Sequence, residues 1–165
     1  SFGTNGQVLT SFPTIVGASN PDDNGTARCV TIQDDGKIIV AGQRFGNSGL
    51  TLLRYNTDGT LDGSFGKGGI ASTGTSLGVA TSIDLQSDGK ILVCANGNTS
   101  FGLARFNING SLDTDFSGDG IATADFSGNE SPPKIALQAD GKIILAGTAE
   151  VSSNLYNLEI GRAHV

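Results

Sequence analysis

The stretch "IQDDGKIIVAG" at residues 32–42 is nearly repeated as "LQSDGKILVCA" at 85–95 and "LQADGKIILAG" at 137–147. The glycines of these three Asp-Gly-Lys phrases, Gly36, Gly89 and Gly141, are 53 and 52 residues apart. A fixed period of roughly 20–50 residues is the signature of a repeat architecture, in which each repeat forms one structural unit. The sequence therefore predicts equivalent units arranged in tandem.

A second phrase follows the same period. It reads "LLRYNTDGTLDGSFGKGGI" at 52–70 and "LARFNINGSLDTDFSGDGI" at 103–121, and the opening "SFGTNG" copies the "SFGKGG" at 64–69. We therefore expect the chain to begin in the middle of a repeat. The repeat region is assigned to residues 1–158, with repeat units at roughly 1–63, 64–114 and 115–158.

Within one repeat the pattern is typical of β-strands. The runs "ARCVTIQ", "KIIVAG" and "LTLLRYN" are apolar or alternating and rich in β-branched residues, and Asx-Gly dipeptides separate such runs. Asp58-Gly59 of one copy becomes Asn109-Gly110 in the next, which keeps the turn chemistry and discards the charge. The position therefore requires a turn, not a carboxylate.

About four short strands per repeat, joined by tight turns, predict an all-β fold of tandem four-stranded antiparallel blades. Three repeats would form a partial β-propeller of about three blades. The chain has no Trp for a WD dipeptide, and its Gly68-Gly69 pair does not recur as a kelch pair would. A parallel β-helix has a shorter coil, and an immunoglobulin-like sandwich does not repeat its turns in this way.

The charge of the chain limits its partners. Sixteen acidic and ten basic residues give a net charge of −6, which argues against nucleic acid and anionic membrane surfaces as partners. The sequence contains no run of the eighteen or more apolar residues that a membrane span requires. Two cysteines, Cys29 and Cys94, are too few for a disulfide framework, and we expect buried free thiols in preference to a bridge.

The phrases "DGKIIVAG" and "LLRYNTDGTLDGSFGKGGI", with their copies, resemble the delta-60 repeat family over nearly the whole chain, from Ser1 to about Leu158. The resemblance implies a β-propeller-like repeat, found mostly in large bacterial secreted or surface-associated proteins. An extracellular or cell-surface location follows from the resemblance alone. The family implies no catalytic residues.

The end of the chain departs from the repeat. Arg54 stands twelve positions after Gly42. The residue twelve positions after Gly147 is Glu159, where the repeat predicts an arginine. The last six residues, "IGRAHV", are what the adapter sequence ATC GGA AGA GCA CAC GTC encodes. We therefore interpret residues 159–165, including the single histidine, as sequencing-adapter read-through and the chain as a fragment of a longer protein.

No constellation of residues predicts catalysis or a cofactor. No histidine within the repeats can serve as a base, and neither cysteine has a partner for nucleophilic or zinc chemistry. Asp62 and Asp113 occupy the same place in successive repeats, as turn or cap residues would, whereas a glycosidase site would interrupt the repeat. We expect these acids to form a repeated ion pair with Arg54 and Arg105 across the hairpin.

Calcium is the main alternative to this structural interpretation. Asn56, Asp58 and Asp62 echo part of an EF-hand loop, but the first and last ligands of such a loop are missing, so hairpin turns are the preferred account.

One insertion could carry a binding site. The first repeat has about ten extra residues, because Phe2 to Gly36 spans 34 residues where the later copies span 24 and 25. Asp22, Asp23 and Asn24 in this insertion are the candidates for a calcium or partner contact, against a solvated acidic loop as the simpler account.

The sequence as a whole predicts a non-enzymatic structural or recognition module without cofactors. Its rigid blades would present loops to a protein or glycan, and the missing blades of the same chain would be further partners. The alternatives are part of a carbohydrate-active propeller enzyme whose site lies in missing blades, and a calcium-stabilised adhesive module.

Overall fold

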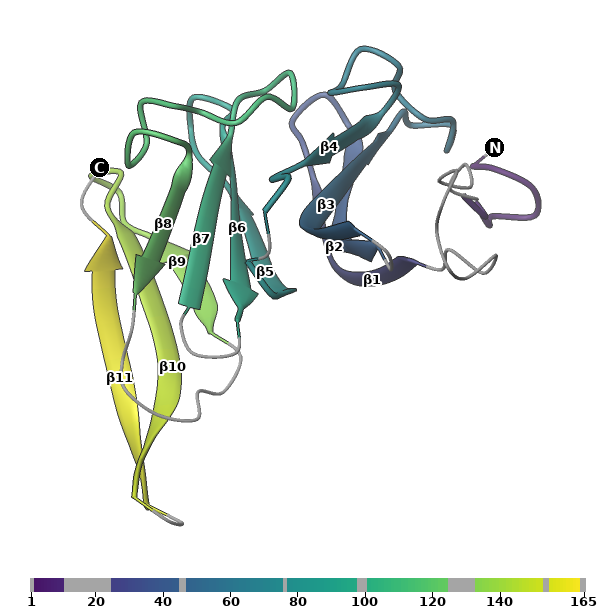
Figure 1. Ribbon diagram of the computed structural model, residues 1–165. Coiled ribbons are helices and arrows are strands. Elements are labelled where there is room, and N and C mark those ends of the chain that lie inside the picture. The colour runs from purple at the N-terminus through teal and green to yellow at the C-terminus, as the bar shows by residue number, and fades with distance from the viewer. Residues whose placement is uncertain are drawn as a thin grey trace.

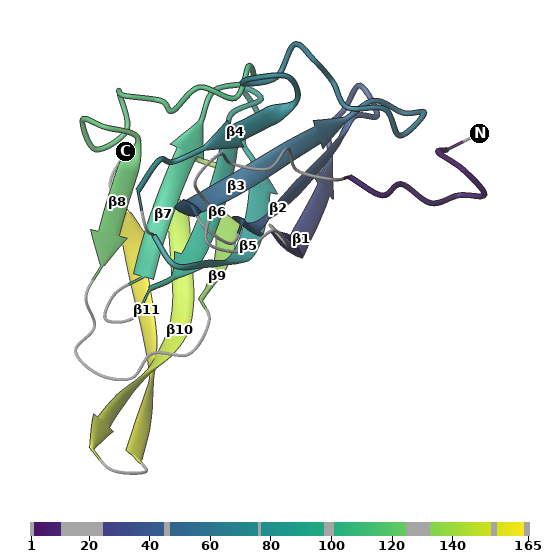
Figure 2. The same ribbon diagram turned by 45° about the vertical axis from the view of Figure 1, so that its right-hand side comes forward.

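A computed structural model describes residues 2–10, 25–44, 47–75, 77–97, 101–124, 133–152 and 155–163. Every regular element in this part of the chain is a β-strand, and the strands form three antiparallel sheets side by side (Figure 1). The predicted all-β, partial propeller of about three blades is therefore confirmed. Residues 2–10 lie beyond the first sheet, at the opposite end of the row from the third (Figure 2).

Strands follow one another within each sheet in chain order, as in a meander. The first sheet contains β1 (Gly25–Ile32), β2 (Ile38–Arg44), β3 (Asn47–Tyr55) and β4 (Ile70–Ser72). The second contains β5 (Val79–Leu85), β6 (Ile91–Asn96), β7 (Phe101–Phe106) and β8 (Ile121–Ala124). The third contains β9 (Lys134–Leu137), β10 (Ile143–Ser152) and β11 (Leu155–Ala163), so two sheets have the predicted four strands and the third has three in the described part.

The Asp-Gly-Lys phrase forms the turn between the first two strands of every sheet. In each copy the glycine N–H donates to the carbonyl of the glutamine three residues before it, at 2.8–2.9 Å. The glycines adopt φ values of 80°, 82° and 82°, a left-handed conformation that other residues seldom tolerate. The three copies, Gly36, Gly89 and Gly141, therefore form the same turn with the same backbone geometry, as a repeat fold requires.

Each sheet packs on the next through alternate residues of its second strand. Ile39 and Ala41 of β2 point into the interface with the second sheet, and Val93 of β6 points back at them. Leu92 and Cys94, which alternate with Val93, point the other way into the interface with the third sheet. The core thus consists of two interfaces between sheets, with the side chains of the middle sheet divided between them.

The sheets are out of phase with the repeat units assigned from sequence. The sheets cover residues 25–72, 79–124 and 134–163, whereas the units change at residues 63 and 114. The choice of starting point in a periodic pattern is arbitrary, so the period itself is unaffected. The units assigned from sequence and the sheets therefore divide the same repeat at different points.

The third hairpin differs from the count made on the sequence. Ile144 of β10 pairs with Arg162 of β11, as Ile39 pairs with Arg54 and Leu92 with Arg105. The repeat arginine position therefore falls at Arg162 and not at Glu159, because the β10–β11 hairpin is longer than the first one. The interpretation of residues 159–165 as read-through stays a prediction.

Candidate functional site

The most elaborate polar cluster lies at the corner of each blade, which we define as the segment between its third and fourth strands, residues 56–69 and 107–120. In the first corner Arg54 Nε donates to Asp62 Oδ2 at 2.8 Å, and both side chains are more than nine-tenths buried. The guanidinium also stacks on the ring of Phe65, with its central carbon 4.5 Å from the ring centroid. The hydroxyl of Ser64 donates to the other carboxylate oxygen, Asp62 Oδ1, at 2.6 Å.

The second corner reproduces the ion pair and the ring stacking, while Asp115 stands in the place of Ser64 and donates its N–H to Asp113 Oδ1 at 3.3 Å. Arg105 Nε donates to Asp113 Oδ2 at 2.6 Å, and its guanidinium stands 4.6 Å from the centroid of Phe116. The predicted Arg-carboxylate pair is therefore confirmed in both copies.

A lysine from the Asp-Gly-Lys turn completes each cluster. Lys37 Nζ lies 3.0 Å from Asp62 Oδ2, and Lys90 Nζ lies 2.9 Å from Asp113 Oδ2. This second cation was not predicted from sequence, although the recurrence of lysine after each Asp-Gly was visible. The turn between the first two strands is thereby tied to the corner of the same blade.

These contacts lower the pKa of both buried carboxyl groups. The hydrogen bond from Ser64 is the largest influence on the pKa of Asp62, which lies well below its usual range, and Lys37 and Arg54 lower it further against the effect of burial. For Asp113 burial raises the pKa, but hydrogen bonds from Lys90 and Arg105 outweigh it, so this pKa is also lowered. A catalytic acid would need the opposite shift.

The stability of the fold should consequently decrease in acid. A carboxylate with a depressed folded-state pKa contributes stability above its unfolded pKa of about 4, and the contribution is lost as the pH falls further. We expect the urea midpoint to be level from about pH 7 to pH 5 and to drop below about pH 4. An Asp62→Asn variant that is folded at pH 7 should show a shallower drop, and an equally steep one would contradict this assignment.

The first corner is also hydrogen-bonded to the blade that follows it. Gly66 N–H donates to the carbonyl of Asn109 at 2.7 Å, and Arg54 Nη1 donates to the carbonyl of Ile108 at 2.6 Å. The N–H of Gly3 donates to the carbonyl of Asp58 at 2.8 Å in the same manner. The cluster therefore stabilises its own hairpin and the joint between blades.

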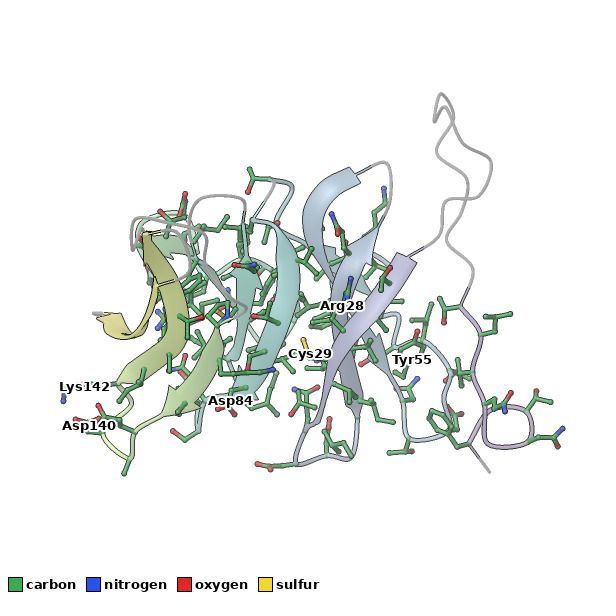
Figure 3. All side chains as sticks on the ribbon, turned by 90° about the horizontal axis from the view of Figure 1, so that it is seen from below. Arg28, Cys29, Tyr55, Asp84, Asp140 and Lys142 are labelled. Atoms are coloured by element: carbon green, nitrogen blue, oxygen red, sulfur yellow. The ribbon has the colours of Figure 1, made fainter. Side chains whose placement is uncertain are left out.

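The remaining recurrent acids close turns, as predicted. Asp35, Asp88 and Asp140 each accept a hydrogen bond from the lysine N–H two residues later, at 3.1–3.2 Å. Figure 3 shows Asp140 and Lys142 at such a turn, at the far end of the row from Tyr55.

In the first corner, the residues considered as calcium ligands, Asn56, Asp58 and Asp62, form hydrogen bonds within the corner itself. Asp58 Oδ1 accepts from both the N–H and the hydroxyl of Thr60, which lowers the pKa of Asp58. Asn56 donates its amide to the same hydroxyl. No group of three or more His, Cys, Asp or Glu side chains that could hold a metal ion occurs among the described residues. The candidate calcium ligands Asp22, Asp23 and Asn24 lie outside the described residues.

Both cysteines are free thiols. Cys94 is fully buried, and burial raises its pKa to about 12. Cys29 is only partly buried, unlike the prediction, and points into the space between the first two sheets (Figure 3). Burial raises the pKa of Cys29 as well, so neither thiol is activated as a nucleophile.

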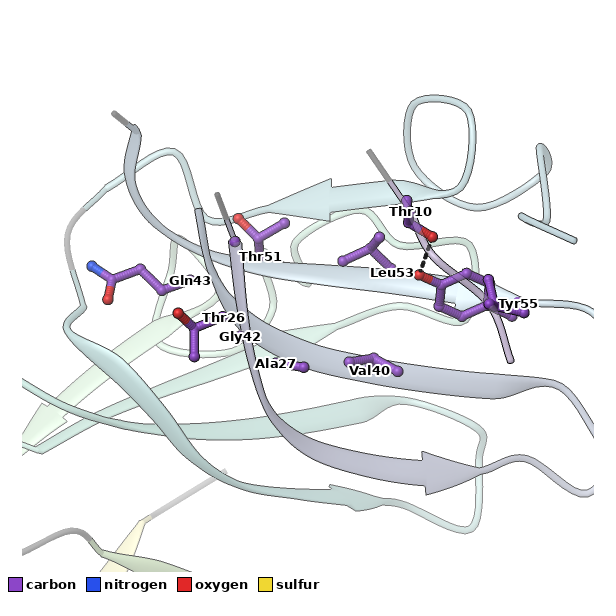
Figure 4. A pocket seen from close by; sticks show the side chains of 11 residues that line it. Thr10, Thr26, Ala27, Val40, Gly42, Gln43, Thr51, Leu53 and Tyr55 are labelled. Atoms are coloured by element: carbon purple, nitrogen blue, oxygen red, sulfur yellow. Dashed lines mark hydrogen bonds between the residues drawn. The ribbon is translucent and has the colours of Figure 1, made fainter. Parts of the chain in front are cut away.

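A hollow of about 190 Å³ lies on the outer face of the first sheet, which we define as the face turned away from the second sheet (Figure 4). Val40, Leu53 and Tyr55 line it from the sheet, and Val8 and Thr10 line it from the N-terminal segment. The hydroxyls of Thr10 and Tyr55 share a hydrogen bond of 2.7 Å across it. The lining is mainly apolar and carries no charged side chain.

The comparison with protein families agrees with this geometry. Residues 33–65, 86–116 and 138–158 match the model of the family described as "Domain of unknown function (DUF5122) beta-propeller". The chain belongs to this family. The first two matched segments of the DUF5122 repeat run from the glutamine of the Asp-Gly-Lys turn to the phenylalanine stacked on the corner arginine.

Other comparisons add little. The chain is similar to the crystal structure of an endo-arabinase from Bacteroides thetaiotaomicron VPI-5482, with a TM-score of 0.46 and 15% identity over 86% of this chain. It spans 55% of the length of that protein. Curated proteins gave no match. Among the described residues no helix is long and apolar enough to cross a membrane.

Proposed function

We propose that this DUF5122 β-propeller chain is a non-enzymatic display scaffold, part of a delta-60 repeat protein that bacteria secrete or carry on the cell surface. Its blades hold loops of variable sequence in fixed positions, where they contact a protein or a glycan. The secreted or surface location rests on the resemblance of its phrases to the delta-60 repeat.

One observation carries the proposal: the two ends of each blade differ in how strictly they repeat. At one end the corner and the Asp-Gly-Lys turn join through the same ion pairs in both copies. At the other end the hairpin between the second and third strands changes length. Counted between register-equivalent residues, Gly42 to Arg54 spans 12 residues, Ala95 to Arg105 spans 10, and Gly147 to Arg162 spans 15. One end of the blades is the same in both copies, and the hairpins at the opposite end differ in length. This is the arrangement expected of a scaffold that presents binding loops.

The chemistry of the recurrent acids also supports a scaffold. The two buried carboxylates are each paired with an arginine and a lysine, and both have lowered pKa values. A glycosidase requires a pair of carboxyl groups with separated pKa values flanking a bound sugar. Ion-paired acids repeated in successive blades serve the fold instead.

A panel of polysaccharides and glycans tests this proposal. The chain is incubated with each polysaccharide while reducing ends are measured, and its binding to the immobilised glycans is measured in parallel. The scaffold proposal expects no release of reducing ends. Release that scales with protein concentration and disappears in an Asp62→Asn or an Asp113→Asn variant of confirmed fold would instead place an enzyme site at the corners.

A calcium-stabilised adhesive module is the second candidate, because the acidic insertion at Asp22 to Asn24 is present only in the first repeat. A bound ion stabilises the folded state by mass action. The scaffold proposal expects the same melting midpoint in millimolar calcium and in chelator. A midpoint that rises with calcium, and does so no longer in an Asp22→Asn, Asp23→Asn variant, would favour the adhesive module.

A further inference from the structure

A groove of about 350 Å³ lies between the first two blades, at the end where their Asp-Gly-Lys turns lie. The first blade contributes three residues of its turn, Gln33, Asp34 and Asp35. The second blade contributes the end of β5, its own turn and one residue of the second corner, namely Leu85, Gln86, Ser87, Gly89 and Ile108. Two adjoining blades therefore form the groove together, and it is large enough to hold a small ligand or a side chain.

The carboxylates of the groove are not neutralised by the lysines of the turns. Lys37 Nζ lies 3.0 Å from the buried Asp62 Oδ2 and only 3.7 Å from Asp35 Oδ2. The lysine of the second turn is likewise paired with the buried carboxylate of its own corner. Among the described residues no lysine or arginine lines the groove. Asp34 and Asp35 therefore give the groove a negative charge.

The second blade adds an apolar surface to the groove. Ile108 is 58% exposed, and its side chain lies over Gly89, where an added Cβ would stand 3.2 Å from its Cδ1. The main chain of Ile108 is held in place, because its carbonyl accepts a hydrogen bond from Arg54 Nη1 at 2.6 Å. Leu85 connects this surface to the core between the sheets. A long aliphatic side chain can cover such a surface while its charged end stays in water.

The wall of the groove also has a hydrogen-bond acceptor to offer. The side-chain oxygen of Gln86 is buried and has no hydrogen-bond partner among the described residues. The main chain of Gln86 is fixed in the turn, since its carbonyl accepts from Gly89 N–H at 2.9 Å. Buried polar atoms are normally paired, so an unpaired acceptor beside two carboxylates favours a ligand that donates hydrogen bonds.

The charge and the apolar surface are particular to this groove and are not part of the repeat. Asp34 corresponds to Ser87 and Ala139 in the later turns, although the aspartate that follows is the same in all three. Ile108 corresponds to Thr57, which lies over the glycine of the first turn in the same way. The turns need neither Asp34 nor Ile108 for their geometry, so these two residues are free to determine what the groove binds.

We propose that this groove binds a lysine or arginine side chain from a basic segment of a partner protein. The cationic group faces Asp34 and Asp35, and the aliphatic stem lies on Ile108. The lining has no aromatic ring on which a sugar could stack, and its charge repels nucleic acid. The inference goes beyond the display role, because that role rests on the hairpins at the opposite end of the blades.

NMR titration of the isotope-labelled chain tests the proposal with a defined probe. The probe is the tripeptide acetyl-Gly-Lys-Gly-amide at millimolar concentrations, and the same peptide with norleucine in place of lysine keeps the stem without the charge. The lysine peptide should shift the backbone amide signals of residues 33–36, 86–89 and 108 in a saturable manner. The norleucine peptide should bind several-fold more weakly, and high salt should weaken the lysine peptide because it screens exposed charges.

Two variants taken from the chain's own repeats test the residues. Asp34→Ser introduces the residue of the second turn, and Ile108→Thr introduces the residue of the first corner, so both should fold as the parent does. Each should weaken binding about threefold, the first by loss of an exposed charge and the second by loss of apolar contact. Asp58→Asn is the matched control, because it removes an exposed carboxylate outside the groove and should leave binding unchanged.

Several results would overturn the proposal. They are the absence of saturable shifts at these amides, equal binding of the norleucine peptide, and an affinity that Asp34→Ser and Asp58→Asn reduce alike. Saturable shifts of the same amides with maltotriose and not with the lysine peptide would assign the groove to a glycan instead. None of these results bears on the display role, which the polysaccharide and glycan panel tests separately.

Discussion

Replacing Asp62 with asparagine is expected to reduce the free energy of unfolding by about 3–5 kcal/mol. The change removes the charge that Arg54 and Lys37 share, and it leaves the arginine buried with no counter-charge. Removing one partner of a buried ion pair costs far more than the pair contributes relative to apolar residues, since the desolvated charge remains. Urea unfolding at pH 7 measures the effect through the shift in midpoint.

The control for this variant is Asp58→Asn. Asp58 lies four residues earlier in the same corner, on an exposed turn, and the second repeat already has Asn109 at its place. We expect little change in the urea midpoint. If the two asparagine variants were equally destabilised, the buried ion pair would not be the source of the loss.

Replacing Phe65 with alanine should have a similarly large effect, about 3–5 kcal/mol. The ring is fully buried, it lies in the interface between the first two sheets, and it supports the guanidinium of Arg54. The variant loses packing on both blades at once, so the thermal and urea midpoints should fall together. A loss of this size approaches the total stability of many domains, and partial unfolding at room temperature is an acceptable outcome.

Phe2→Ala is the matched control, because Phe2 is the repeat equivalent of Phe65 but is only half-buried. We expect a clearly smaller loss, measured under the same conditions. An equal loss would mean that residues 2–10 contribute as much to the monomer as the corner of a complete blade does.

The sequence predicted the parts of this fold that depend on residues close together in the chain. Asp35 and Asp58 lie in turns whose geometry is local, so Asx-Gly spacing was sufficient to place them. The pairing of Arg54 with Asp62 was also predictable, because the two residues are eight apart across a single hairpin.

Contacts between distant segments could not be predicted in the same way. Lys37 reaches Asp62 only because β2 and β3 pair in one particular register, and Arg54 reaches the carbonyl of Ile108 only because two sheets pack together. The third hairpin shows the limit of counting: Arg162, and not Glu159, faces Ile144 because loop length varies without altering the pairing of the strands.

The joint between blades has a consequence for how such chains change over evolutionary time. Its recurrent hydrogen bonds run from the amides of Gly3 and Gly66 to the carbonyls of Asp58 and Asn109, so they involve only main-chain atoms. Point mutation at the accepting residue leaves the bond in place, and aspartate and asparagine serve equally well. A gene can therefore gain or lose one whole repeat by unequal recombination, because each new neighbouring blade offers the same main-chain donor and acceptor.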